Sequence, residues 1–374
     1  MFKNLFFQFI SIFNFFSFTY VLILLFIFGY LEIVSEAFLI LSLITIFTQG
    51  FSSNIRNIYL GSLDFFIHKK IRFRILIGIL GFFLSVIVSY IFIGKSYIFL
   101  YSSLIFLSVT NWILELLHAK NEKKKHLNIY IIINIFFFLI SSFFFIYLKK
   151  IIFLTLIIYI FAFLNIFIYK NYFIYFRLQR FSLKNLKFDL GTFSTFLKST
   201  VNFCSRYFII IFIGKLDASL LFVGFILGSF FGTLFDISYG AFFLKNINNK
   251  NFFLKIFYVI YFILVLGFVY FIKKFSFYNS EQFNLFFIST LFSVLGSYFA
   301  IVSLHQRQLL FEKPLNREIC YKADIYIYLF NFLCVPFLYY LDRDYLLMTY
   351  FVNSLLFYVI YVIIIKNVIQ KKNS

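Results

Sequence analysis

The chain has 374 residues, of which 63% are hydrophobic, 25% aromatic and only 13% charged, and it carries a formal net charge of +20. Because a soluble domain is about half apolar and about a quarter charged, such a chain cannot cover its apolar surface with polar side chains. A soluble enzyme, a disordered protein and a disulfide-rich secreted domain are excluded, and the composition predicts a polytopic membrane protein.

Apolar segments long enough to cross a bilayer follow one another along the whole chain. A helix needs about 20 apolar residues to cross roughly 30 Å of hydrocarbon, and barrel strands are much shorter. We therefore predict an all-α fold with about 12 transmembrane helices in two six-helix lobes. The predicted spans are Leu5–Tyr30, Ala37–Ile58, Ile75–Gly94, Tyr97–Leu117, Leu127–Leu148, Ile151–Tyr169, Phe193–Gly214, Ser219–Leu244, Phe252–Ile272, Asn284–Leu304, Ile325–Leu341 and Tyr345–Ile365. Ten or eleven spans is the alternative, because some breaks between them are short.

The basic residues alternate between loops, and this alternation gives the orientation. Lys and Arg concentrate in cytoplasmic loops. With a cytoplasmic N-terminus, 26 of the 34 Lys and Arg residues fall on the cytoplasmic side, seven on the outer side, and Arg206 within a span. Both termini are therefore predicted to be cytoplasmic. The net positive charge is explained by this orientation and by contact with anionic lipid head groups on the cytoplasmic side. We therefore expect no nucleic-acid binding.

The longest polar interval, 170–192, divides the predicted spans into two blocks. Basic residues such as Arg177 and Arg180 alternate there with apolar ones, which is typical of an amphipathic segment on the inner leaflet. We predict an N-terminal six-helix lobe over 1–169, a cytoplasmic amphipathic connector over 170–192 and a C-terminal six-helix lobe over 193–374.

The two blocks resemble each other weakly. In each block the first span leads into an apolar second span through a short outer turn, Tyr30–Leu31–Glu32 or Lys215–Leu216–Asp217. An even-numbered repeat with one orientation gives parallel halves, which is a common transporter design. The alternative is chance similarity between apolar helices.

One basic residue, Arg206, lies deep within a predicted span, where an ionisable group is costly and is a functional candidate. Asn202, Ser205 and Arg206 share a helical face with Lys198, since offsets of four, seven and eight residues keep side chains in a narrow arc. Asp236 lies at a similar depth in the next helix, roughly 10–12 Å from the cytoplasmic side. One interpretation is that Arg206 and Asp236 form a structural ion pair. The other is that Arg206 binds an anionic phosphate group.

Further polar residues complete the predicted sites. Asn14 is a predicted member of a substrate cavity, with packing as the alternative. Glu115 is, with Asp236, a predicted ion-pair or ion-coupling residue, and the alternative for Glu115 is an interfacial residue beside the basic loop 120–125. The three cysteines form no CxxC pattern, the four histidines are scattered, and there is no Walker, GxGxxG or HExxH motif. We therefore predict no metal, no cofactor and no catalytic residue.

Two stretches carry a resemblance to a known family. The sequence LGTFSTFLKSTVNFCSRYFIIIFIGKLDASLLFVGFILGSFFGTLFDISYGAFFL, from Leu190 to Leu244, resembles the start of the second lobe in polysaccharide-type flippases. The segment FNFFSFTYVLILLFIFGYLEIVSEAFLILSLITIFTQG resembles the matching start of the first lobe. Together with the predicted topology, the basic connector and the small outer loops, these stretches make the chain resemble the Wzx-like O-antigen and polysaccharide exporters of the multidrug/oligosaccharidyl-lipid/polysaccharide superfamily.

The resemblance implies two lobes around a central cationic cavity that opens alternately to either side of a bacterial inner membrane. The cargo would be an undecaprenyl-diphosphate-linked oligosaccharide, moved outward for surface polysaccharide or O-antigen assembly, with other assembly proteins as partners and without enzymatic activity. Arg206 is the residue implied as a cavity cation, followed by Lys198 and Arg56. The alternatives are a membrane polysaccharide polymerase or lipid-linked glycosyltransferase, which would need larger outer loops, and an ion-coupled multidrug antiporter, which would prefer an anionic cavity.

A reporter that works only in the cytoplasm, fused after Ser374, tests the orientation. We expect full activity from it, and no activity from a reporter that needs an oxidising exterior, because an even number of crossings returns the chain to the cytoplasmic side. The opposite pattern would rule out the twelve-span topology.

Overall fold

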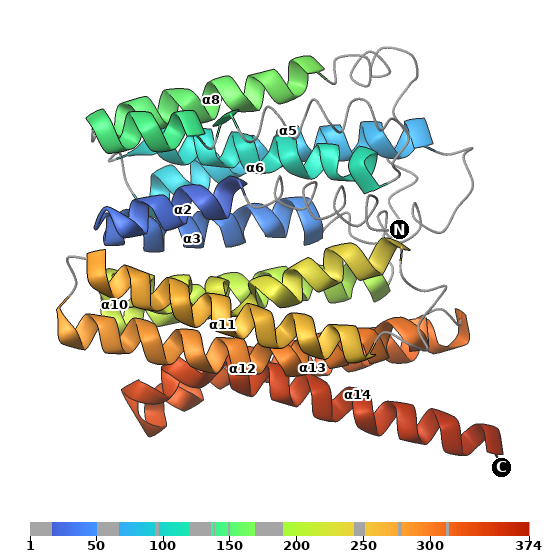
Figure 1. Cartoon of the computed structure of the whole chain (residues 1–374). Helices are drawn as coiled ribbons and strands as arrows, with labels where there is room; N and C mark the ends of the chain where they lie inside the picture. Colours follow the sequence, from blue (N-terminus) through green and yellow to red (C-terminus); the bar gives the residue numbers. More distant parts are fainter. Residues whose placement is uncertain are drawn as a thin grey trace. The chain divides into compact units, whose positions relative to one another are not determined.

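The computed structural model describes residues 17–50, 67–93, 97–119, 136–137, 139–148, 150–168, 190–242, 251–275, 279–311 and 314–373. Nearly all of these residues are helical, and there is no strand among them (Figure 1). Six of the described helices are long and apolar enough to cross a membrane. The protein is a multi-pass membrane protein with an all-α fold, as its composition predicts.

Helices cover the described part of every predicted span. In the first block they are α2 (Ser17–Ile27), α3 (Leu31–Thr45) with the π-helical turn η1 (Ile46–Gly50), α5 (Ile67–Ile93), α6 (Ile98–Ala119), the helical residues Leu139–Leu148 and α8 (Ile151–Ile168). In the second block they are α10 (Leu190–Phe242), α11 (Asn251–Phe275), α12 (Ser280–Phe311), α13 (Pro314–Leu341), the 3₁₀ helix η4 (Arg343–Met348) and α14 (Thr349–Asn373). The count of twelve crossings stays a prediction.

Some helices continue well beyond the predicted spans at the ends that are predicted to be cytoplasmic. Helix α12 ends at Phe311 where Leu304 was expected, and α13 begins at Pro314 where Ile325 was expected. The sequence analysis placed these ends where charged residues begin. Charge marks the edge of the hydrocarbon, but a helix continues into the head-group region because charged residues such as Lys, Arg and Glu are good helix formers. As a result, α12 and α13 form a hairpin with only two residues between them.

Two of the predicted outer turns each contain a glycine with a positive φ. Gly29 has a φ of 79° and Gly214 a φ of 83°, in the left-handed region that glycine adopts without a steric penalty. The Tyr30 amide donates to the Leu25 carbonyl at 3.0 Å, which closes α2 as a Schellman motif. Gly214 divides α10 into two helical segments. Each glycine directly precedes one of the two matching turn sequences, and the repeat stays a prediction.

The chain divides into two compact units, one of Met1–Val21 with Glu36–Phe203 and one of Leu22–Ser35 with Cys204–Ser374. Of the connector 170–192, only residues 190–192 lie within the described part of the chain, where they begin α10. The division into lobes at 170–192 therefore stays a prediction.

In each unit a phenylalanine ring makes aromatic contacts across a closely packed helix pair. In the first unit α6 packs against α5 and α8, and the Phe106 ring contacts the Phe163 ring of α8 at 5.0 Å between centroids. In the second unit α12 packs against α14, and the Phe299 ring contacts Phe351 and Tyr358 at 5.8 and 5.4 Å. Both pairs join the fourth and sixth predicted spans of their block, so the same pairing recurs in the two blocks.

Within the second unit, small residues let the second segment of α10 approach α12 closely. A Cβ atom added to Gly228 would lie 2.1 Å from the Cβ atom of Ser293 and 2.6 Å from its backbone carbonyl carbon. One helical turn earlier, a Cβ atom on Gly224 would lie 2.1 Å from the Ser289 hydroxyl oxygen. Helix pairs in membranes associate through such close backbone contacts, because lipid tails compete with larger apolar side chains.

Replacing Gly228 by alanine tests this contact. We expect Gly228→Ala to destabilise the protein by about 1–3 kcal/mol, because backbone atoms of α12 would have to move. Gly267→Ala in α11 is the matched control, since a Cβ atom there has no neighbour within 4 Å. It should be neutral or stabilising. Thermal unfolding in detergent measures both, and an equal midpoint for the two variants would contradict the close approach.

Candidate functional site

The predicted polar face of α10 lies on its first segment, before Gly214. Lys198 and Asn202 are exposed, and Ser205 and Arg206 are partly buried. At about 100° per residue, Lys198, Asn202 and Arg206 lie within a sector of about 80°, and Ser205 borders it. Arg206 is eight residues, or about 12 Å, from both Lys198 and Gly214. We call these four residues the polar stripe.

The opposite side of the same segment is apolar and exposed. Phe193, Tyr207 and Ile211 are 41%, 37% and 57% exposed, as expected of side chains that face lipid. The segment therefore has two accessible sides of opposite character. A charged side chain costs about 2.5–3.5 kcal/mol at the centre of a lipid-facing helix, so the polar stripe is the side that suits water or a polar ligand.

The other sequence-predicted site residues cannot be compared with the stripe. Arg56 and Asn14 lie outside the described residues. Glu115 falls within α6 and Asp236 within the second segment of α10, but the side chains of both lie outside the described part of the chain. The pairing of Arg206 with Asp236 and the coupling roles of both acids stay predictions.

The clearest ionic interaction in the second unit involves residues that the sequence analysis assigned to a cytoplasmic loop. Arg307, near the end of α12, donates from Nε to both carboxylate oxygens of Asp324 in α13, at 3.2 and 2.9 Å, and from Nη2 to Oδ2 at 2.7 Å. The Tyr361 hydroxyl of α14 donates to Asp324 Oδ1 at 2.6 Å. Three helices thus meet at one carboxylate, and we call Arg307, Asp324 and Tyr361 the inner cluster.

The inner cluster is enclosed by apolar side chains. The side chain of Asp324 is 0% exposed and that of Arg307 21% exposed. Leu310, Cys320, Ala323 and Ile327 pack around it with Tyr361. Because the carboxylate accepts four hydrogen bonds, its charge is compensated where water cannot reach it. The sequence does not reveal this cluster, because Asp324 directly precedes the predicted span that starts at Ile325 and therefore looks like a loop residue. In the structure α13 begins earlier, at Pro314, and Asp324 lies within the helix.

The first unit also buries a basic residue at the predicted edge of a span. Arg74 of α5 is 2% exposed, and its guanidinium carbon lies 4.2 Å from the centroid of the Trp112 ring of α6. Next to Trp112, Asn111 accepts from the amide of Asn165 in α8 at 3.4 Å. In each block, therefore, an arginine that was predicted to lie in a loop packs between helices instead: Arg74 in the first block and Arg307 in the second.

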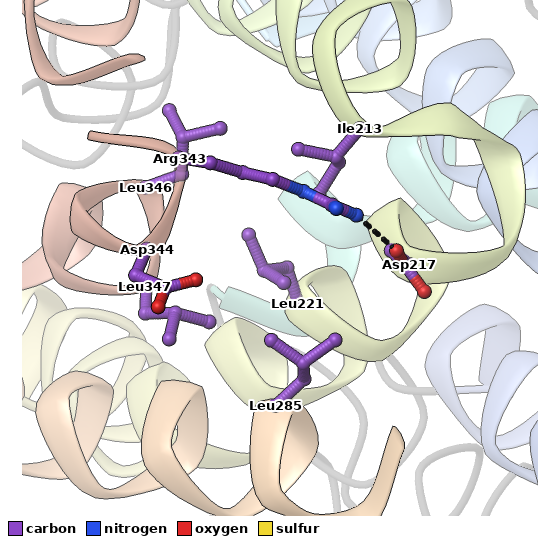
Figure 2. Close-up of a pocket in the computed structure, with 8 residues that line it drawn as sticks. All are labelled: Ile213, Asp217, Leu221, Leu285, Arg343, Asp344, Leu346 and Leu347. Atoms are coloured by element: carbon purple, nitrogen blue, oxygen red, sulfur yellow. Dashed lines mark hydrogen bonds and ion pairs between the residues drawn. The ribbon is translucent and has the colours of Figure 1, made fainter. Parts of the chain in front are cut away.

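Two polar contacts join residues near predicted outer loops, whose sidedness stays a prediction. Arg343 pairs with Asp217, and the Tyr101 hydroxyl donates to Glu36. Asp217, Arg343 and Glu36 were all assigned to the outer side. Figure 2 shows the Arg343 side chain reaching Asp217 beside a small pocket whose lining includes Leu221 and Leu285. Because Arg343 is 56% exposed, this pair contributes little to stability.

No family model matches the chain, and no curated protein or solved structure matches it. Within the described residues, no group of three or more His, Cys, Asp or Glu side chains is placed to hold a metal ion.

Tyr361→Phe tests the inner cluster, because it removes one hydrogen bond to a buried carboxylate and keeps the ring. We expect a loss of about 1–2 kcal/mol in stability. Tyr340→Phe is the matched control, since Tyr340 is 87% exposed and its variant should unfold like the wild type. Thermal unfolding in detergent gives the comparison, and equal midpoints would show that the Tyr361 hydroxyl contributes nothing.

Proposed function

We propose that this protein is a flippase that moves an undecaprenyl-diphosphate-linked oligosaccharide from the inner to the outer leaflet of a bacterial inner membrane. The observation that carries the proposal is the polar stripe on α10, which lies on the side of the helix opposite its apolar exposed face. The sequence resemblance to polysaccharide exporters points to the same helix. The all-α, multi-pass fold is compatible with such a transporter.

The chemistry of the cargo suits the residues of the stripe. A diphosphate cannot enter hydrocarbon without its hydration shell being replaced. The planar guanidinium of Arg206 can bind a phosphate through two parallel hydrogen bonds, and Asn202 and Ser205 can donate to its other oxygens. Lys198 lies about 12 Å nearer the predicted cytoplasmic end, so the head group would meet Lys198 first and Arg206 in mid-membrane.

Alternating access would complete the reaction. The polyprenyl tail stays in the bilayer, and only the head group needs a polar route. Rocking of one group of helices against another would open the stripe to the cytoplasm and then to the exterior. Since net binding must be weak enough for release, a few cationic and amide groups serve this route better than a dense cluster of charge.

Translocation in vesicles tests the proposal. Purified protein is reconstituted with a fluorescent undecaprenyl-diphosphate oligosaccharide, and the label in the outer leaflet is measured over time. We expect Arg206→Gln to slow translocation about ten- to a hundredfold, as expected for the loss of a charged hydrogen-bond donor, and Arg206→Lys to slow it less. Lys366→Gln, an exposed position on α14, removes the same charge and should leave the rate unchanged.

The same preparation separates the alternatives. Elongation of the lipid-linked sugar would indicate a polymerase or glycosyltransferase, and exchange of a cationic drug for protons or sodium would indicate an antiporter. Well-folded wild-type protein that translocates no lipid-linked oligosaccharide would rule out the flippase. An Arg206→Gln variant that unfolds at a much lower temperature would assign Arg206 to packing.

A further inference from the structure

Helix α13 of the α12–α13 hairpin carries an acidic residue that opposes its insertion into a membrane. The segment Asn316–Leu341 is the least apolar of the six candidate spans in the described residues. It contains Asp324, whose side chain is 0% exposed. An ionised acid on a membrane helix opposes insertion unless it is partnered. Something must therefore compensate this carboxylate when α13 enters the bilayer.

The compensating charge lies on the preceding helix. Arg307 is 17 residues before Asp324, and only two residues separate α12 from α13. The two side chains meet through a bidentate pair, so the hairpin presents no net charge at this point. Because Arg307 and Asp324 lie on consecutive helices of one hairpin, only 17 residues apart, the pair can form before any later helix is present.

The other charges of α13 do not share this role. Lys322 pairs with Glu318 at 2.8 Å one helical turn away, but both side chains are more than 60% exposed. Water and head groups solvate such residues, and an exposed pair of this kind contributes little. Arg317 is exposed as well. Asp324 is the acid of this helix whose side chain is enclosed.

We propose that the Arg307–Asp324 pair is an insertion device. It allows α12 and α13 to enter the membrane as a charge-neutral hairpin, and it thereby sets the orientation of α13, α14 and the C-terminus. Tyr361 then adds its hydrogen bond when α14 packs against the hairpin. This role is independent of the cargo, so it holds whether or not the protein is a flippase.

A C-terminal dual reporter on the full-length chain tests the device, because it reads the orientation of the C-terminus without requiring folded or active protein. Arg307→Leu leaves Asp324 without its partner. We expect the ratio of correctly to incorrectly oriented C-termini to fall roughly tenfold. Arg317→Leu is the matched control, since it removes one positive charge from the same cytoplasmic connection without affecting the buried pair. It should leave the ratio near that of the wild type.

Two double variants give the decisive comparisons. Arg307→Leu with Asp324→Leu removes both charges and should restore the orientation that Arg307→Leu loses. Arg307→Asp places two acids in the hairpin, and adding Asp324→Arg to it should recover the orientation by forming the pair in reverse.

The opposite outcomes would overturn the proposal. If Arg307→Leu and Arg317→Leu shift the orientation equally, the effect belongs to the general bias of positive charge and not to the pair. If Arg307→Leu leaves the orientation unchanged, or if the double variants stay as disturbed as the single ones, the pair has no role in insertion.

Discussion

Hydrocarbon solvates charge poorly, and this constraint explains how the buried ionisable groups among the described residues are partnered. In the second unit a carboxylate with no exposed surface accepts four hydrogen bonds from Arg307 and Tyr361. In the first unit a buried guanidinium lies over the face of Trp112. Breaking such a pair costs far more than the pair itself contributes, because the remaining charge has no water to replace its partner.

The polar stripe of α10 lies in a different environment from these buried groups. Lys198 and Asn202 are exposed along a helix whose opposite side presents Phe193, Tyr207 and Ile211. Where a charge is neither enclosed nor placed against lipid, water or a polar ligand is the remaining environment. The inner cluster holds three helices together around one carboxylate, whereas the stripe has exposed polar members on a single helix. We therefore propose transport for α10 and insertion for the α12–α13 hairpin.

Small residues decide how closely the apolar helices approach one another. Gly224 and Gly228 bring α10 against Ser289 and Ser293 of α12, and Gly296 brings α12 against Tyr350 and Phe351 of α14. Apolar side chains cannot provide this selectivity, because a phenylalanine gains nearly as much from lipid tails as from another helix. Glycine and serine therefore set the closest backbone approaches, in a chain where aromatic residues are far more numerous.

The sequence by itself determined the class of protein, the helical fold and the approximate place of each apolar segment, because hydrocarbon thickness fixes helix length and leaves few alternatives. It also identified Lys198, Asn202, Ser205 and Arg206 as one helical face, since that follows from periodicity alone. Only the tertiary structure showed that Arg307, Asp324 and Tyr361 meet. Charged residues at the end of an apolar run look the same in a sequence whether a loop begins there or the helix continues, and the choice between solvent and a buried partner depends on which helices pack together.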